Sequence, residues 1–172
     1  FWLFGFLILW EIPYYIESKP NSKKSPISIS VIIPARNEEN NLENLFNSLS
    51  NQTVNVKEVI LADDSSIDKT PEIGKKHNAK VIRLKSLPKD WIGKSWACYN
   101  GAKTATGDYF LFLDADTRLK NNGIENLISC LERYPGVISL QPYHKINKIY
   151  ENLSLFFNII LVAGMGVFTP FQ

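Results

Sequence analysis

Asp108-Tyr-Phe-Leu-Phe-Leu-Asp114-Ala-Asp116 is the stretch that most narrows the fold and the chemistry of this chain. In it, an apolar run with strand character ends on two carboxylates, two positions apart. A buried strand has no packing use for two acids at its C-terminal end, where like charges repel. Open α/β sheets do place ligands at the ends of parallel strands, and two carboxylates there suit a divalent cation that holds a diphosphate. The alternative is an acidic turn in which Asp116 or Thr117 caps the next helix.

Strand-like and helix-like segments alternate on both sides of that stretch. The predicted strands are 27–33, 56–62, 79–84, 109–113 and 137–140, and the predicted helices are 38–50, 67–78, 93–105 and 121–134. Strands and helices that alternate at this spacing predict an α/β fold, with a mostly parallel sheet and helices on both faces. The chain has 172 residues, enough for one such domain with a proper core.

Polar clusters follow three of the predicted strands at the point where each strand ends. They read Pro34-Ala-Arg-Asn-Glu38, Asp63-Asp64-Ser-Ser66 and Asp114-Ala-Asp116. In a parallel sheet all three lie at one edge and can converge on a single crevice. One acidic strand end is commonplace, but neither packing nor solubility explains three on one edge.

The sequence lacks the usual phosphate-binding loops. No G-x-G-x-x-G follows the first predicted strand, where Arg36 and Asn37 stand in place of glycines, and there is no Walker A sequence. A Rossmann dinucleotide site is therefore excluded and an NTPase is unsupported. A diphosphate would have to be held in another way, and a metal ion on Asp116 is the natural candidate.

Composition argues against several other classes of protein. The net charge is +2 and the Lys and Arg residues are scattered, so we expect no nucleic-acid partner. Cys98 and Cys130 form no metal-type pair and are interpreted as small core residues of a reducing compartment. His77 and His144 lie far apart in sequence, and each is better explained as a surface or hydrogen-bonded histidine than as a metal ligand.

Apolar segments flank the predicted domain. We expect a partial transmembrane or membrane-anchor helix at 1–17, a linker at 18–26, the α/β domain at 27–147 and an apolar, truncated interfacial helix at 148–172. The expected location is a membrane, with the domain on the cytoplasmic side, where Lys19, Lys23 and Lys24 follow the first segment. The alternatives are a buried core helix or a signal-peptide remnant for the first segment, and a core helix for the last.

Four motifs in order resemble one known family, the family 2 glycosyltransferases, which have the GT-A fold. They are Ser30-Val-Ile-Ile-Pro-Ala-Arg-Asn-Glu38, Val59-Ile-Leu-Ala-Asp-Asp-Ser-Ser-Ile-Asp68 with Thr70, Gly93-Lys94 through Asn100-Gly101, and Gly107-Asp108 leading to Asp114-Ala-Asp116. Two further stretches, Trp91-Ile-Gly-Lys-Ser-Trp-Ala-Cys98 and Ser139-Leu-Gln-Pro-Tyr-His144, are similar to the membrane-associated carotenoid-acid glucosyltransferase branch, with its hopanoid-associated relatives.

The resemblance implies a role for each matching residue. Those that would bind the nucleotide sugar are Pro34, Ala35, Arg36, Glu38, Asp63, Asp64, Lys94 and Asp114. Among them, Asp64 would accept the uracil N–H, Asp63 would support its loop and Lys94 would reach the phosphates. Asp116, with Asp114, would hold Mg²⁺ or Mn²⁺ against the diphosphate of a UDP-sugar. The implied acceptor is lipid-like or carotenoid-type.

No catalytic base is assigned. The inverting members of the family use a carboxylate in a later motif, and the acids after Asp116 are Glu125, Glu132 and Glu151, none in such a motif. We therefore expect a metal-dependent glycosyltransferase in which the acceptor half lies outside this chain. A nucleotide-sugar-binding relative without catalysis and a nucleotidyltransferase remain as alternatives. The sequence leaves open the sugar, the acceptor, the stereochemical outcome and the oligomeric state.

Overall fold

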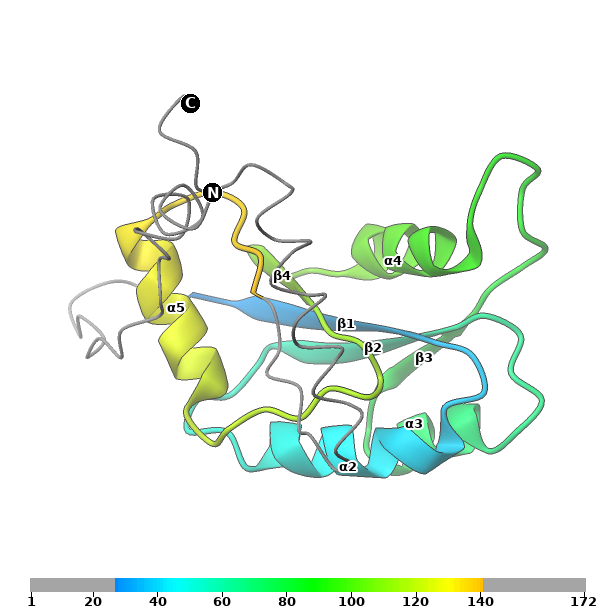
Figure 1. The fold of residues 1–172 in the computed structure, drawn as a ribbon, viewed down its shortest axis with the longest axis horizontal. Helices are drawn as coiled ribbons and strands as arrows, with labels where there is room; N and C mark the ends of the chain where they lie inside the picture. The colour runs from blue at the N-terminus through cyan, green and yellow to red at the C-terminus, as the bar shows by residue number, and fades with distance from the viewer. Residues whose placement is uncertain (1–26, 141–172) are drawn as a thin grey trace, which may run out of the picture. The chain divides into compact units, whose positions relative to one another are not determined.

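Four parallel strands form the sheet of this protein, for which the computed structural model describes residues 27–140. The strands are β1 (Ile29–Ala35), β2 (Glu58–Asp63), β3 (Lys80–Arg83) and β4 (Tyr109–Phe112). Their order in the sheet is β3-β2-β1-β4, and every neighbouring pair is parallel (Figure 1). The prediction of a mostly parallel α/β sheet is confirmed.

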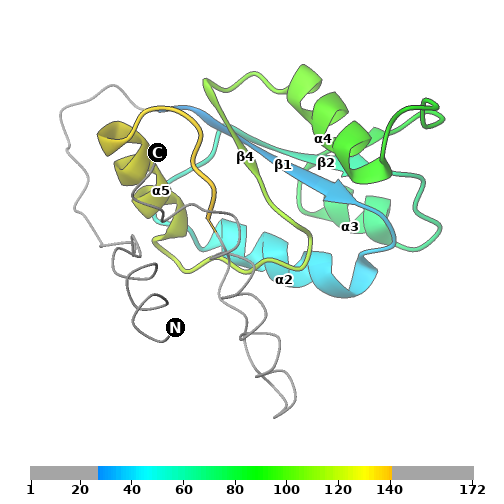
Figure 2. The same ribbon diagram turned by 45° about the horizontal axis from the view of Figure 1, so that its top comes forward.

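Helices cover both faces of this sheet, as predicted. They are α2 (Glu39–Ser50), α3 (Thr70–Lys76), α4 (Gly93–Thr104) and α5 (Gly123–Arg133). Figures 1 and 2 show α2 and α3 on one face and α4 on the other. In the register, Ile32 lies beside Ile60 and Ile33 beside Leu61, so Ile32 and Leu61 point to opposite faces.

Glycines let two of the helices approach the sheet closely. A Cβ added to Gly74 of α3 would lie 2.5 Å from a methyl group of Leu61, and one added to Gly101 of α4 would overlap a methyl group of Ile32. The main core lies on the α2 side, where Leu42, Leu45 and the α5 residue Ile124 belong to one buried cluster with residues of β1. The sheet is therefore fixed from both faces, which gives its carboxyl edge a defined shape.

Two predicted elements differ from the structure. The predicted strand at 137–140 is wrong, because these residues pair with no other strand in the described part of the chain and Val137 is fully exposed. The helix predicted at 67–78 begins only at Thr70, because Ile67 is 94% exposed and belongs to the loop after β2.

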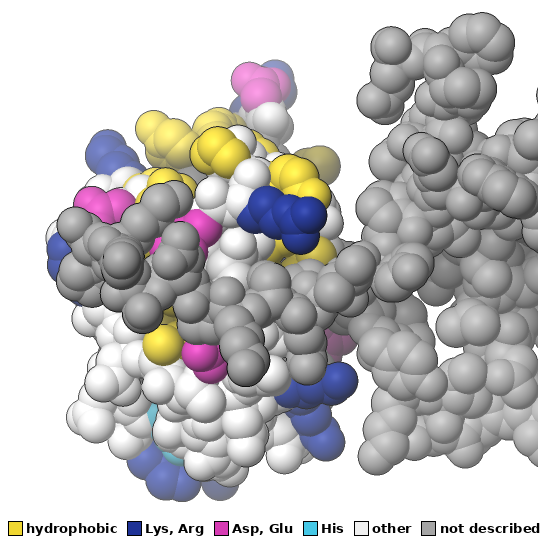
Figure 3. Space-filling view, turned by 90° about the vertical axis from the view of Figure 1, so that its left-hand side faces the viewer, with side chains coloured by type: hydrophobic (Ala, Val, Ile, Leu, Met, Phe, Trp, Pro, Cys, Tyr) yellow, Lys and Arg dark blue, Asp and Glu magenta, His cyan; other side chains and the backbone are white. Residues whose placement is uncertain are grey.

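Hydrophobic side chains also reach the surface of the described part (Figure 3). Phe110 and Phe112 are about half exposed on β4, which pairs with β1 alone among the described strands. No helix within residues 27–140 is long and apolar enough to cross a membrane. The predicted segments at 1–17, 18–26 and 148–172 lie outside the described residues, as does the end of the predicted domain, 141–147.

Candidate functional site

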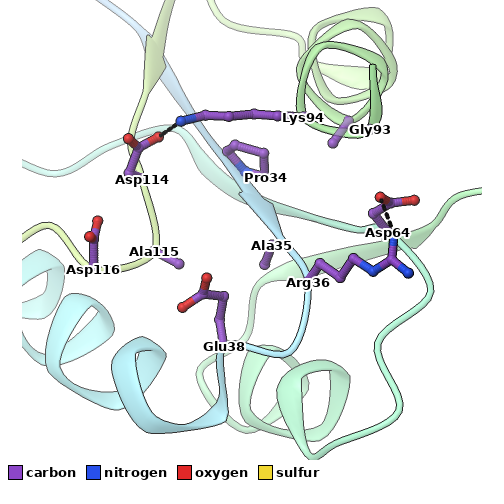
Figure 4. A pocket seen from close by; sticks show the side chains of 11 residues that line it. Pro34, Ala35, Arg36, Glu38, Asp64, Gly93, Lys94, Asp114, Ala115 and Asp116 are labelled. Atoms are coloured by element: carbon purple, nitrogen blue, oxygen red, sulfur yellow. Dashed lines mark ion pairs between the residues drawn. The ribbon is translucent and has the colours of Figure 1, made fainter. Parts of the chain in front are cut away.

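The strand order creates a crevice at the carboxyl ends of β1 and β4. The chain runs from β1 to β2 and β3 on one side, and then returns to β4 on the other side of β1. Such a reversal of strand order separates the loops that follow the two strands and leaves room for a ligand. An open pocket lies at this point (Figure 4). Its lining residues are Pro34, Ala35, Arg36, Glu38, Asp64, Gly93, Lys94, Ala97, Asp114, Ala115 and Asp116.

The structure brings all of the predicted site residues except Asp63 to this pocket. They come from four places in the chain: the end of β1, the loop after β2, the first turn of α4 and the loop after β4. Sequence reasoning assigned no role to Gly93, Ala97 or Ala115, which also line the pocket. Their small size is the only feature of the sequence that could have indicated this position, since small side chains leave room for a ligand close to the backbone.

Asp63 does not line the pocket and is fully buried at the end of β2. Its Oδ1 accepts a hydrogen bond of 3.1 Å from the backbone N–H of Ser66. Its Oδ2 lies 3.5 Å from Nε of Arg83, has no hydrogen-bond partner in the described part of the chain, and is shielded from solvent. Asp63 therefore shapes the loop after β2 from within.

That loop is joined to the loop after β1 by reciprocal hydrogen bonds. The backbone N–H of Asn37 donates to Oγ of Ser66 at 2.9 Å, and Oδ1 of Asn37 accepts from the backbone N–H of Ile67 at 3.0 Å. Asn37 and Ser65 both have a positive φ, 57° and 60°, which is uncommon outside glycine. The two loops that carry Arg36 and Asp64 are thus held in one arrangement by polar contacts between them.

A second set of contacts ties the start of α2 to the start of α3. The backbone N–H of Glu38 donates to Oγ1 of Thr70 at 2.8 Å, and that of Glu39 donates to Oδ2 of Asp68 at 3.1 Å. Burial raises the pKa of Asp68, but hydrogen bonds from Thr70 and Glu39 outweigh it and leave the pKa below its ordinary value. Asp68 and Thr70 belong to the family motif but had no predicted role; in the structure they hold the backbone at the start of α2, where Glu38 lines the pocket.

The first turn of α4 approaches Asp64 closely. A Cβ added to Gly93 would lie 2.6 Å from Oδ2 of Asp64, so only glycine leaves this carboxylate in place. The same oxygen lies 3.5 Å from Nη1 of Arg36, whose side chain is 67% exposed, while that of Asp64 is 17% exposed. One end of the pocket thus presents a mostly buried carboxylate between a helix N-terminus and a guanidinium.

The other end of the pocket holds a second ion pair. Nζ of Lys94 lies 2.7 Å from Oδ1 of Asp114, and this hydrogen bond raises the pKa of Lys94 above its ordinary value (Figure 4). Asp116 follows two residues later at the same edge and forms no ion pair among the described residues. The pocket therefore has one exposed carboxylate paired with a lysine and one that forms no ion pair within residues 27–140.

The donor set fits Mg²⁺ or Mn²⁺ only in part. Asp114 and Asp116 supply two carboxylates, and no group of three or more His, Cys, Asp or Glu side chains able to hold a metal ion occurs within residues 27–140. Mg²⁺-type sites that use one or two carboxylates complete their coordination with phosphate oxygens and water. The residues present therefore fit a cation that binds together with a diphosphate.

Within residues 27–140, the cysteines and His77 form no further site. Cys98 and Cys130 are free and partly buried, and burial raises the pKa of Cys98. Nε2 of His77 lies 2.7 Å from Glu43, and its ring stacks on Phe46. The interpretation of His77 as a hydrogen-bonded histidine is confirmed, whereas His144 lies outside the described residues.

Comparison with known proteins gives a family and several relatives. The family model for glycosyl transferase family 2 matches residues 30–159. The 4,4'-diaponeurosporenoate glycosyltransferase of Staphylococcus haemolyticus (strain JCSC1435) is 46% identical over 147 residues, and that of Staphylococcus aureus (strain USA300) is 38% identical over 146. Each match covers 83% of this chain and 39% of the relative, so the chain spans about two fifths of their length.

Solved structures with a similar fold include S. aureus TarS 1-349 in complex with UDP. That structure has a TM-score of 0.54 and 27% sequence identity, over 63% of this chain and 33% of that one. The complex of the same protein with UDP-GlcNAc gives a TM-score of 0.53 and 27% identity, over 63% of this chain and 32% of that one.

Proposed function

The chain belongs to glycosyl transferase family 2, with a sheet of the GT-A type, and from this premise we propose that residues 27–140 bind the nucleotide-sugar donor of a sugar transfer. The donor is a UDP-linked sugar. This choice is supported by the relatives of similar fold that were crystallised with UDP and UDP-GlcNAc. The observation that carries the proposal is the meeting of Asp64, Lys94, Asp114 and Asp116 around one pocket at the reversal of strand order.

The two ends of the pocket bind different parts of the donor, the uracil base at one end and the diphosphate with its cation at the other. Asp64, at the less exposed end, accepts the uracil N–H, because a carboxylate there offers a charged acceptor to a neutral donor. Asp116 and Asp114, at the other end, hold the divalent cation. Pro34, Ala35 and Glu38 line the wall between them, and Asp63 keeps the loop of Asp64 in place.

The charges at the pocket suit the departure of a diphosphate. When the bond between the sugar C1 and the phosphate oxygen breaks, positive charge develops on the sugar and negative charge on the leaving diphosphate. Arg36 and Lys94 place positive charge at the pocket, where it stabilises this transition state more than the ground state. A divalent cation bound by the two carboxylates would neutralise further charge on the leaving group.

For the whole protein we propose transfer of the sugar to a lipid-like acceptor, of the carotenoid-acid type. The support is the name of the relatives that match 83% of this chain, 4,4'-diaponeurosporenoate glycosyltransferase. We place the protein at a membrane with residues 27–140 on the cytoplasmic side, following the apolar run at 1–10 and the lysines at 19, 23 and 24. Carbonate extraction of membranes, followed by protease treatment of sealed vesicles, tests both the attachment and the side.

Calorimetry with UDP and UMP, with and without Mn²⁺, tests the donor site. Asp116→Ala should remove the Mn²⁺-dependent part of UDP affinity, whereas Asp64→Ala should weaken UDP and UMP alike. Asp108→Asn is the matched control, because Asp108 lies at the opposite end of β4 and bonds to Ser28. If UDP binding to Asp116→Ala still depends on Mn²⁺, the assignment of Asp116 to the metal ion is refuted. If Asp64→Ala loses affinity for UDP but not for UMP, Asp64 contacts the phosphates and not the base.

A further inference from the structure

The two carboxylates after β4 are in different states, although they lie two residues apart. Oδ1 of Asp114 is 2.7 Å from the ammonium group of Lys94. Asp116 has no cation within ion-pair distance in the described part of the chain. A lysine thus already occupies one of the two carboxylates that the proposed donor site assigns to a divalent cation.

Lys94 is able to leave Asp114 at little structural cost. Its side chain is 63% exposed and that of Asp114 is 55% exposed, so more than half of each side chain is open to solvent. The backbone of Lys94 is fixed in the first turn of α4, where the buried neighbour Ala97 packs toward the sheet. The ammonium group of lysine is a compact charge on a flexible stem, and it can therefore change partners while its Cα stays in place.

Lys94 and a divalent cation compete for the same carboxylate. An ammonium group 2.7 Å from Asp114 and a cation bound by Asp114 and Asp116 would lie within a few ångströms of each other and repel. A diphosphate in the pocket removes this conflict, because its oxygens offer Lys94 another partner on the same wall. The nucleotide would then free Asp114 for the metal ion by binding Lys94. The metal ion would in turn free Lys94 for the nucleotide by binding Asp114.

We propose that Lys94 stands in for the divalent cation in the free protein, and that its exchange from Asp114 to the diphosphate couples the binding of nucleotide and metal. The inference rests on the proposed donor site. By thermodynamic linkage, UDP and Mn²⁺ must raise each other's affinity by the same factor. Part of that factor belongs to Lys94, in addition to the direct bonds between metal and phosphate.

Lys94→Met tests this coupling in the 172-residue chain, since methionine keeps an unbranched side chain, one atom shorter than that of lysine, and removes its charge. The free Mn²⁺ concentration is measured by electron paramagnetic resonance, with and without UDP, and UDP affinity without metal is measured by calorimetry. In Lys94→Met, Mn²⁺ alone should bind roughly three- to tenfold tighter, because the competing charge is gone. UDP without metal should bind more weakly, and the coupling factor should fall by a similar ratio.

Two control variants separate the exchange from a general effect of charge. Lys103→Met removes one positive charge from the last turn of the same helix, away from the pocket, and should leave both affinities unchanged. Lys94→Arg keeps the charge and should retain the coupling. Asp114→Asn releases Lys94 and should strengthen the metal-free binding of UDP by about threefold.

The outcomes distinguish this inference from the donor site on which it rests. If the wild-type chain binds neither UDP nor Mn²⁺, the donor site itself is refuted. If the wild type binds both, but Lys94→Met leaves the affinity for Mn²⁺ alone unchanged or weaker, the exchange is refuted and the donor site stands. If Asp114→Asn lowers the affinity for UDP in the absence of metal, the Lys94–Asp114 ion pair stabilises the pocket and does not hold Lys94 back from the nucleotide. That result would refute the exchange.

Discussion

Gly93→Ala is the substitution that most directly tests the geometry of the nucleotide end of the pocket. Gly93 opens α4, and an added Cβ would lie 2.6 Å from Oδ2 of Asp64. The atom in the way is the end of a flexible side chain, so the Asp64 carboxylate moves and the backbone stays. The variant therefore displaces the proposed uracil acceptor without deleting it.

The expected losses of binding and of stability differ in size. A hydrogen bond to a charged group is worth about 1.5–3 kcal/mol, which corresponds to a loss of UMP affinity of roughly 10- to 150-fold. The fold loses little, because the Arg36–Asp64 pair has an exposed partner and such pairs contribute about 0–1 kcal/mol. Alanine also gains up to about 1 kcal/mol over glycine in a helix, so the melting temperature should stay close to that of the wild type.

The assay is calorimetric titration of UMP, with thermal unfolding followed by circular dichroism. UMP is the probe because it reports on the base without the second phosphate. Gly123→Ala is the matched control: Gly123 opens α5 in the same way, and its added Cβ meets only ordinary contacts of 3.5 Å or more. UMP affinity equal to the wild type in Gly93→Ala would show that Asp64 does not bind the base from its observed position. An equal loss in both variants would point to a helix effect.

Three further predictions concern the framework of the site. Gly101→Ala should lower the free energy of unfolding by about 1–2 kcal/mol in urea titrations, because the cost of the overlap between the new Cβ and Ile32 exceeds the gain in helix propensity. Unchanged stability would mean that α4 can shift away from the sheet at no cost. Thr70→Val should cost about 1–3 kcal/mol by leaving the Glu38 N–H unpaired, and a near-neutral result would show that water replaces the hydroxyl. Hydrogen bonds from Thr106 and Ser30 hold the pKa of Glu58 below 4.5, so its stabilising effect is complete above pH 4.5 and is lost as the pH falls through the folded-state pKa. The stability advantage over Glu58→Gln should therefore shrink below pH 4.5, and a constant difference in acid unfolding curves would contradict this.

The layout of the sheet and the position of the site could be predicted from local sequence. Arg36, Asp64 and Asp114 each follow the carboxyl end of a strand within two residues. Because the strands are parallel, these ends lie at one edge of the sheet, which is enough to bring the three residues together. The failed strand at 137–140 shows the limit of that reasoning. Val137 and its neighbours have β-branched character, but a strand requires a partner, and pairing is decided by residues far away in sequence.

The contacts that shape the pocket could not be predicted in the same way. The distance of 2.7 Å between Lys94 and Asp114 depends on how deeply α4 settles on β1, which in turn depends on the lack of a side chain at Gly101. The bond from the Glu38 N–H to Thr70 joins the starts of two helices, 32 residues apart. Local patterns identify such residues as polar or small, but only the packed structure shows which partner each one meets.

Most of the acids at this edge of the sheet have a cationic partner. Asp63 faces Arg83, Asp64 faces Arg36 and Asp114 faces Lys94, each cation coming from a different segment. Three carboxylates can therefore lie at one edge of the sheet, two at the end of β2 and one after β4, without strong mutual repulsion. Asp116 breaks the pattern, since no cation pairs with it among the described residues.

This difference separates the roles of the two acids after β4. A carboxylate that already has a cation gains less from a metal ion than one that has none, because the existing partner must first be displaced. Asp116 is therefore the residue on which metal affinity should depend most, and Asp114 is the one through which the nucleotide can influence it. An arrangement of this kind disfavours a metal ion bound without nucleotide and favours the two together, which is the state that the proposed metal-assisted sugar transfer requires.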